Sequence, residues 1–187
     1  MNRRDGVRGP FEMRTIMRRR TAVKPKVVLL CVIFLAAALS GCATKTPDYD
    51  VQEVRCVYNY GDMDKAELDV FTPDGTVTRY VVTPYSDSGI NLFEGQIPSD
   101  DKCEKKESTI SPDEWNAIVE AVKSSDFMNL PEDLPKVEAY DGSTWYIEVD
   151  TSIGKHRSGG YCAGNGSGKE HERFYSVKSV LFDLLRK

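Results

Sequence analysis

The chain has 187 residues, of which 40% are hydrophobic and 29% are charged, and this composition excludes a multi-span membrane protein and a low-complexity chain. The net charge of −4 hides an asymmetry: residues 1–41 carry nine basic and two acidic side chains, which leaves 16 basic and 27 acidic ones in residues 42–187, a net of −11. Such an acidic body repels phosphates, so we expect no nucleic-acid partner.

Residues 1–41 have the three parts of an export signal. A basic region is followed by the apolar residues 27–39, and small residues then lead directly into Cys42. The apolar run of 13 residues is shorter than the ~20 residues that cross a bilayer as a helix. This pattern predicts a cleaved signal peptide over residues 1–41.

The tetrapeptide Leu39-Ser40-Gly41-Cys42 matches the lipobox, so this segment resembles the precursors of bacterial lipoproteins. The resemblance implies cleavage after Gly41, lipidation of Cys42, and anchoring in the cell membrane or outer membrane with the body on the extracytoplasmic side. Two or more acyl chains anchor a protein stably, whereas one binds only marginally. A retained transmembrane anchor and a secreted, non-lipidated protein are the alternatives. The initiating residue also stays open between Met1, Met13 and Met17.

Behind a polar tether at residues 42–51, we expect one α+β domain over residues 52–187, a small antiparallel sheet with two helices packed on one face. Alternating apolar residues predict strands at 51–60, 68–71 and 77–82, the last two joined by a turn at Asp74-Gly75. Residues 90–93 suggest a short strand, and residues 102–108 fit a charged edge strand or a solvated loop equally well. A second hairpin is predicted from Asp141-Gly142, with strands over 144–150 and 155–158.

Two capping signals predict the helices. Ser111-Pro112-Asp113-Glu114 forms a capping box ahead of an apolar stripe, so a helix should begin there and end near Ser124. Ser167-Gly168-Lys169-Glu170 reads as a second capping box for the C-terminal helix. Trp115 and Trp145 lie on apolar stripes, which favours core packing over stacking on sugar rings.

Three cysteines lie in the body, Cys56, Cys103 and Cys162. Exported proteins form disulfides, and Cys56 and Cys103 both fall in expected strands, so we expect these two to be bridged and Cys162 to be free. The other two pairings and the absence of any bridge stay open. A cysteine nucleophile would need His156 or His171 as its base, and an inert thiol at Cys162 is the favoured interpretation.

A glycine-rich loop is expected over residues 159–168, ahead of the C-terminal helix. It is not a nucleotide site, because Ala163 and Glu170 stand where a Walker A loop needs Gly and Ser or Thr. The acidic pairs of the chain lack the rest of a calcium loop, and we expect no metal and no cofactor.

The same loop is nevertheless the candidate ligand or partner site of the body. Free N–H groups at a helix N-terminus favour anions, and His156, Arg157 and Lys169 lie close to it in sequence. With Gly159, Gly160 and Tyr161 they form the candidate set. The alternative is that the glycines only permit a tight connection between strand and helix.

Residues 111–187 resemble small bacterial lipoproteins that carry no established activity, through the helix start at 111–115, Asp-Gly-Ser-Thr-Trp at 141–145 and Gly-Gly-Tyr at 159–161. We therefore expect a membrane-anchored envelope lipoprotein that acts as a non-enzymatic binding module, with an envelope protein or a cell-wall component as its partner. The alternative is an extracytoplasmic hydrolase that uses His156, Cys162 or carboxylates around residues 159–168.

Overall fold

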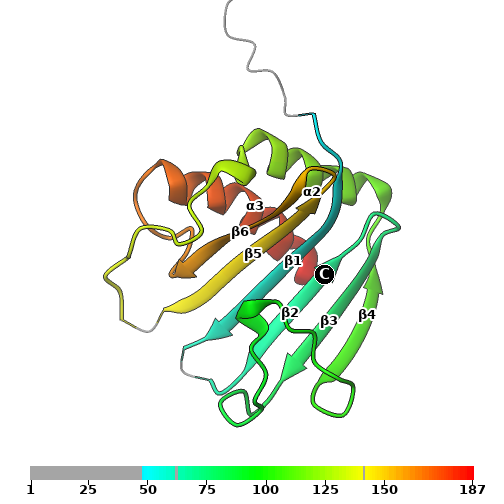
Figure 1. The fold of residues 1–187 in the computed structure, drawn as a ribbon, viewed down its shortest axis with the longest axis vertical. Helices are drawn as coiled ribbons and strands as arrows, with labels where there is room; N and C mark the ends of the chain where they lie inside the picture. The colour runs from blue at the N-terminus through cyan, green and yellow to red at the C-terminus, as the bar shows by residue number, and fades with distance from the viewer. Residues whose placement is uncertain (1–47, 62, 141) are drawn as a thin grey trace, which may run out of the picture. The chain divides into compact units, whose positions relative to one another are not determined.

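The computed structural model describes residues 48–61, 63–140 and 142–187 (Figure 1). The expected signal peptide, the lipidation site at Cys42 and most of the tether lie outside these residues. No helix in the described part of the chain is long and apolar enough to span a bilayer.

Six strands form one antiparallel sheet in the order β4-β3-β2-β1-β5-β6, and two helices complete the α+β fold that the sequence predicts. The helices lie behind the sheet in Figure 1, and residues of both join one core cluster with the same face of the central strands. The strands are β1 (Val51–Tyr60), β2 (Ala66–Phe71), β3 (Thr76–Val82), β4 (Glu104–Thr109), β5 (Ser143–Thr151) and β6 (Gly154–Tyr161); the helices are α2 (Pro112–Ser124) and α3 (Lys169–Leu185).

The first capping box is formed as predicted, and the second is not. The Ser111 N–H donates to the Glu114 carboxylate over 2.7 Å, and the Glu114 N–H donates to the Ser111 hydroxyl over 3.3 Å. Helix α3 instead begins at Lys169, so its N-cap residue is Gly168, which has φ of +118° and no side chain that could cap the helix. A side chain caps a helix from the N-cap position, so Ser167 lies one residue too early to do so.

Of the two remaining expected strands, one is absent and the other is formed. Residues 90–93 do not form a strand; the 3-10 helix η1 (Leu92–Glu94) begins there, and Leu92 is fully buried. The charged segment does form an edge strand, β4, with all six of its residues exposed. Charged side chains on an open edge discourage pairing with another chain.

The glycines of the expected loop partly belong to strand β6, so the loop prediction over residues 159–168 is wrong at its start. A Cβ on Gly159 would lie 2.1 Å from the Trp145 carbonyl oxygen, so the position requires glycine for close approach to β5. The Gly159 N–H donates to the Glu132 carbonyl over 3.0 Å, and the Leu134 N–H donates to the Gly159 carbonyl over 2.8 Å. The segment before β5 thus covers the outer edge of β6 (Figure 1).

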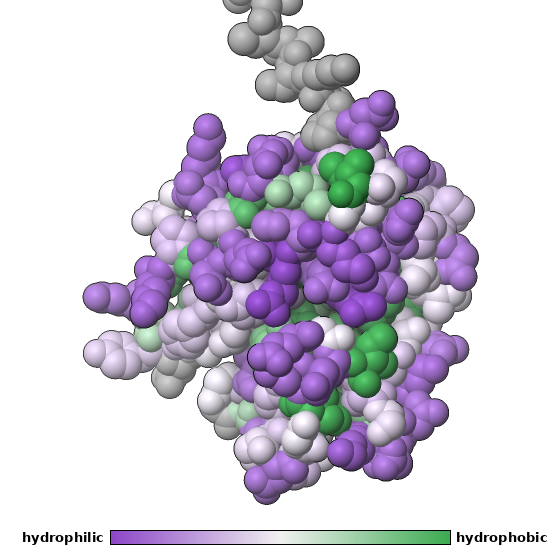
Figure 2. All heavy atoms as spheres, viewed as in Figure 1, coloured by the Kyte–Doolittle hydropathy of each residue, from purple (hydrophilic) through white to green (hydrophobic). Residues whose placement is uncertain are grey.

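The sheet buries apolar residues on both faces. On the face away from the helices, Val57, Leu68 and Val82 pack with Leu92 under the connection between β3 and β4. Figure 2 views the molecule from this side and shows mostly hydrophilic side chains with small, separate hydrophobic patches. The turn between β5 and β6, residues 152–154, and Tyr161 at the end of β6 are exposed.

Candidate functional site

The cationic residues expected around the glycine-rich segment do not converge. His156 and Arg157 are consecutive in β6, so their side chains point to opposite faces of the sheet. The His156 ring lies edge-on to Phe127 at 5.9 Å, whereas Arg157 donates to the Phe93 carbonyl and lies 4.9 Å from the centre of the Tyr146 ring. Lys169 is exposed at the start of α3. The expected anion site is therefore not assembled from these residues.

The connection into α3 is held by side chains from inside the fold. The Gly164 N–H donates to His171 Nδ1 over 3.2 Å, and His171 Nε2 lies 3.0 Å from the Pro135 carbonyl, so Nε2 carries the proton. Lys178 Nζ donates to the Ala163 carbonyl over 3.0 Å, and burial lowers the pKa of this lysine. These contacts support the alternative interpretation, in which the glycine-rich segment only connects β6 tightly to α3.

The histidines and Cys162 do not form a catalytic pair. His156 and Cys162 lie near opposite ends of β6, about 20 Å apart at ~3.3 Å per residue. Both ring nitrogens of His171 are engaged by backbone groups. The hydrolase hypothesis therefore loses Cys162 paired with His156 or His171, and of its named groups only the carboxylates around residues 159–168 remain.

The expected Cys56–Cys103 disulfide is wrong, because all three cysteines of the body are free. Cys56 lies in β1 on the helix side, whereas Cys103 packs with the cluster on the opposite face beside β4. Three strand spacings separate β1 from β4, about 14 Å, and a disulfide requires Cα atoms within ~7 Å. Burial raises the pKa of both thiols, so neither is an activated thiolate.

A cavity of about 410 Å³ lies at the open end of the β5–β6 hairpin, and two of the predicted site residues line it. Gly160 and Tyr161 come from β6, Tyr146 comes from β5, and the remaining lining residues come from the segment that covers the edge of β6. We call this cavity the tyrosine pocket; its lining residues are Asp133, Leu134, Lys136, Val137, Tyr146, Gly160 and Tyr161.

Both tyrosines of the tyrosine pocket are fixed by hydrogen bonds. Tyr161 Oη accepts from the Gly142 N–H over 2.7 Å and donates to the Ala139 carbonyl over 3.1 Å, while the residue keeps 42% of its surface exposed. Tyr146 Oη donates to Asp133 Oδ1 over 2.8 Å, and burial together with this hydrogen bond raises the pKa of Tyr146. The pocket therefore presents aromatic groups that lose little freedom when a ligand binds.

The pocket also carries two opposite charges with unused hydrogen-bonding capacity. Asp133 uses one carboxylate oxygen for Tyr146, and within the described residues its other oxygen has no hydrogen-bond partner. The exposed Lys136 likewise has no ion-pair partner in the described part of the chain. Arg157, one of the predicted site residues, contributes only indirectly, because it packs against the Tyr146 ring.

A second site, missed by sequence reasoning, is a buried charged cluster on the helix side of the sheet. Asp69 is 0% exposed and accepts hydrogen bonds from Arg79 over 2.7 and 3.4 Å. Burial raises the pKa of Asp69 to about 6 even though Arg79 opposes this shift. Next to this pair, Tyr58 donates to Glu67, and Lys65 forms an ion pair with the same carboxylate. The register of the β2–β3 hairpin, which pairs Asp69 with Arg79, is the signal that could have identified the pair.

Asp69 and Arg79 line a groove of about 340 Å³ between strands β2–β4 and the ends of the two helices. Its charges already have partners within the fold: Arg79 with Asp69, Lys106 with Glu104, Glu107 with Lys105, and Lys187 with Glu114. The groove thus offers a ligand fewer unused charged groups than the tyrosine pocket does.

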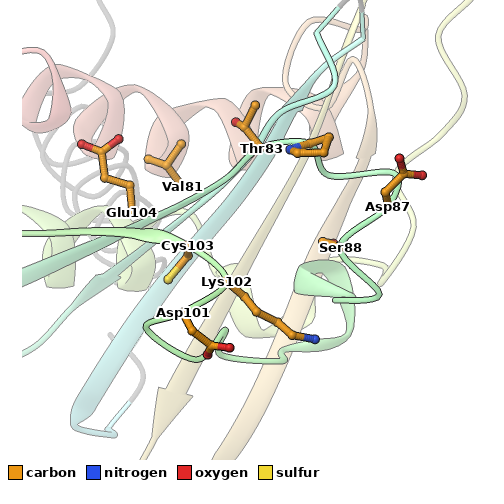
Figure 3. Close-up of a pocket in the computed structure, with 9 residues that line it drawn as sticks. Val81, Thr83, Asp87, Ser88, Asp101, Lys102, Cys103 and Glu104 are labelled. Atoms are coloured by element: carbon orange, nitrogen blue, oxygen red, sulfur yellow. The ribbon is translucent and has the colours of Figure 1, made fainter.

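A third depression of about 500 Å³ lies between the segment after β3 and the residues that lead into β4 (Figure 3). Of its three carboxylates, Asp87 and Glu104 point away from Cys103 in Figure 3. Burial and the charge of the third, Asp101, raise the pKa of the thiol, so Asp101 does not activate it. This depression therefore lacks a convergent set of chemical groups.

No known protein family matches this sequence, and no curated protein is similar enough in sequence to count as a relative. Within residues 48–61, 63–140 and 142–187, no group of three or more His, Cys, Asp or Glu side chains is arranged to hold a metal ion. The export signal and the tyrosine pocket are therefore the two features of this chain that bear on its function.

Proposed function

We propose that the chain is a bacterial envelope lipoprotein, anchored through lipid on Cys42, whose body is a non-enzymatic module that binds an envelope component in the tyrosine pocket. The lipobox motivates the anchor. Six positions separate Cys42 from Asp48, the first described residue, and an extended chain spans at most ~3.6 Å per residue. Such a tether keeps the body within about 20 Å of the membrane, where cell-wall components and other envelope proteins are its available partners.

The observation that carries the binding role is the construction of the tyrosine pocket. Tyr146 and Tyr161 are fixed by the fold, and Asp133 and Lys136 offer a charged acceptor and a charged donor beside them. A mostly apolar concave site with a few placed polar groups is the usual form of a ligand site. The charged residues of the Asp69–Arg79 groove already form ion pairs within the fold. His156 and Cys162 are too far apart to act together.

The anchor is tested by replacing Cys42 in cells that produce the full-length chain. We expect the unaltered chain to incorporate labelled palmitate and to sediment with membranes, and Cys42→Ala to abolish both. The matched control is Cys31→Ala, because Cys31 lies in the apolar run of the signal and is not an expected acceptor of lipid. Unchanged labelling and sedimentation of Cys42→Ala would exclude Cys42 as the residue that carries the lipid anchor.

The binding role is tested by association of the purified protein with envelope fractions from which the lipid has been extracted, because lipid on Cys42 would otherwise hold every variant on the membrane. Tyr161→Ala should reduce this association, because it removes the exposed ring of the pocket. Tyr175→Ala is the matched control, since Tyr175 is 52% exposed and does not line the pocket. Equal association of the two variants would remove the pocket from the binding function.

A further inference from the structure

We infer that the ligand of the tyrosine pocket is an uncharged glycan strand of the cell wall, bound through one pyranose ring. This inference rests on the binding role proposed above and names the ligand class of that same site. Three properties of the pocket carry it: its charge balance, its fixed aromatic groups and the empty volume beside Gly160.

Charge favours a neutral ligand. The pocket contains one carboxylate, Asp133, and one ammonium group, Lys136, so its local charge is balanced. Residues 42–187 carry a net charge of −11, which repels polyanions such as phosphate-linked wall polymers at longer range. A polycationic ligand would place a positive charge beside Lys136. An uncharged polymer meets neither repulsion.

The aromatic groups suit the two kinds of surface on a sugar. One face of a pyranose ring consists of C–H groups that pack on an aromatic ring, and its edge carries hydroxyls that need donors and acceptors. Tyr161 offers a half-exposed ring, and the two hydrogen bonds of its hydroxyl group hold this ring in place. Asp133, through its unused oxygen, and Lys136 lie in the same lining and can accept from and donate to hydroxyls.

The fold keeps the space beside these groups open. The atoms nearest to a Cβ on Gly160 would be the backbone N and O of Leu134, each 4.0 Å away, so a side chain here would meet no clash and its absence leaves the space open. Gly160 also has φ of +139°, which disfavours other residues. The volume of about 410 Å³ falls within the range of ~300–1,000 Å³ that is usual for small-ligand sites.

The test measures binding of defined oligosaccharides to the mature lipidated protein, residues 42–187, in neutral phospholipid vesicles by isothermal titration calorimetry. The probe is the neutral tetramer of β-linked N-acetylglucosamine. The comparison ligands are its de-acetylated, cationic counterpart and an anionic glycerol-phosphate oligomer. We expect the neutral tetramer to bind at least ~10-fold more tightly than either charged ligand.

Two variants keep the test independent of folding. Tyr161→Ala should weaken binding of the neutral tetramer at least ~10-fold, and Lys136→Glu should weaken it as well, because the ammonium group that donates to sugar hydroxyls is then lost. Lys136 is exposed, so its replacement does not threaten the fold. The matched controls, Tyr175→Ala and Lys102→Glu, make the same changes outside the pocket and should leave binding unchanged.

Stronger binding of either charged ligand, or equal affinity in Tyr161→Ala and Tyr175→Ala, would overturn the inference. Failure of the neutral tetramer to bind, while wall peptides or an envelope protein bind in a Tyr161-dependent way, would refute the glycan but leave the binding function standing. Failure of every envelope ligand to bind would refute both. Binding of the tetramer without attachment of the isolated glycan strands of the cell wall would assign the pocket to a soluble saccharide and overturn the choice of source.

Discussion

The buried ion pair between Asp69 and Arg79 gives the sharpest stability prediction. Arg79→Met keeps an apolar stem of similar length but leaves a carboxylate that is 0% exposed without its cation. Breaking a buried pair from one side costs about 3–5 kcal/mol, because the remaining charge stays buried and uncompensated. Since domains of this size are stabilised by about 5–15 kcal/mol, the variant should lose a large part of its stability at pH 8.

The pH dependence of this loss has a definite sign. The pKa of Asp69 is raised in the folded state, mainly by burial, from 3.8 to about 6. A raised carboxyl pKa contributes stability below the unfolded pKa, and this contribution is lost as the pH rises through the folded pKa. Without Arg79 the pKa of Asp69 should rise further, so at pH 5 the variant buries a neutral acid and its deficit should be smaller than at pH 8.

Urea unfolding of residues 48–187, which contain the sheet and both helices, at pH 5 and pH 8 measures both effects. The double variant Asp69→Leu/Arg79→Met is the control, because it removes both charges and should be more stable at pH 8 than Arg79→Met alone. A cost below about 1 kcal/mol at pH 8, or the same cost at both pH values, would refute the reasoning.

The remaining predictions concern packing, capping and close approach. Phe174→Ala should lower the free energy of unfolding by about 3–5 kcal/mol, because the ring is fully buried between helix and sheet; urea unfolding measures this. Ser111→Ala should cost about 1 kcal/mol in the same assay, since the Glu114 N–H loses its acceptor. Gly159→Ala should lower the free energy of unfolding by about 1–3 kcal/mol and lower the Tm, because its Cβ would lie 2.1 Å from the Trp145 carbonyl oxygen. An unchanged Tm would show that β5 can shift away from β6 without loss of stability. Bonds from Lys187 and Ser111 lower the pKa of Glu114 to about 2, so Lys187→Ala should raise it in an NMR titration.

Local signals predicted the parts of the fold that local contacts determine. The capping box at Ser111 and Glu114 fixed the start of α2, and Asp74-Gly75 placed the turn between β2 and β3. The role of Gly159 could not be read locally, because the atom that forbids a side chain there belongs to β5. The Cys56–Cys103 prediction failed for a similar reason, since strand order decides which cysteines can meet.

The candidate site was predictable only in part. Gly160 and Tyr161 were singled out, whereas Asp133, Lys136 and Tyr146 reach the pocket through pairing of a distant segment with the edge of β6. The grouping of His156 with Arg157 was wrong for a reason that the sequence already contained. Consecutive residues of a strand point to opposite faces of the sheet, and the predicted strand over 155–158 contained both residues, so their side chains could not lie together.

Photocrosslinking in living cells shows whether the tyrosine pocket binds an envelope component. A photoreactive residue at Val137, in the lining of the tyrosine pocket, is compared with one at Ile153, which is 69% exposed in the turn at the other end of the β5–β6 hairpin. We expect a recurrent adduct with one envelope component from Val137 that Tyr161→Ala removes, and no such adduct from Ile153. An adduct pattern that is the same at both positions, or that persists in Tyr161→Ala, would contradict a binding role for the tyrosine pocket.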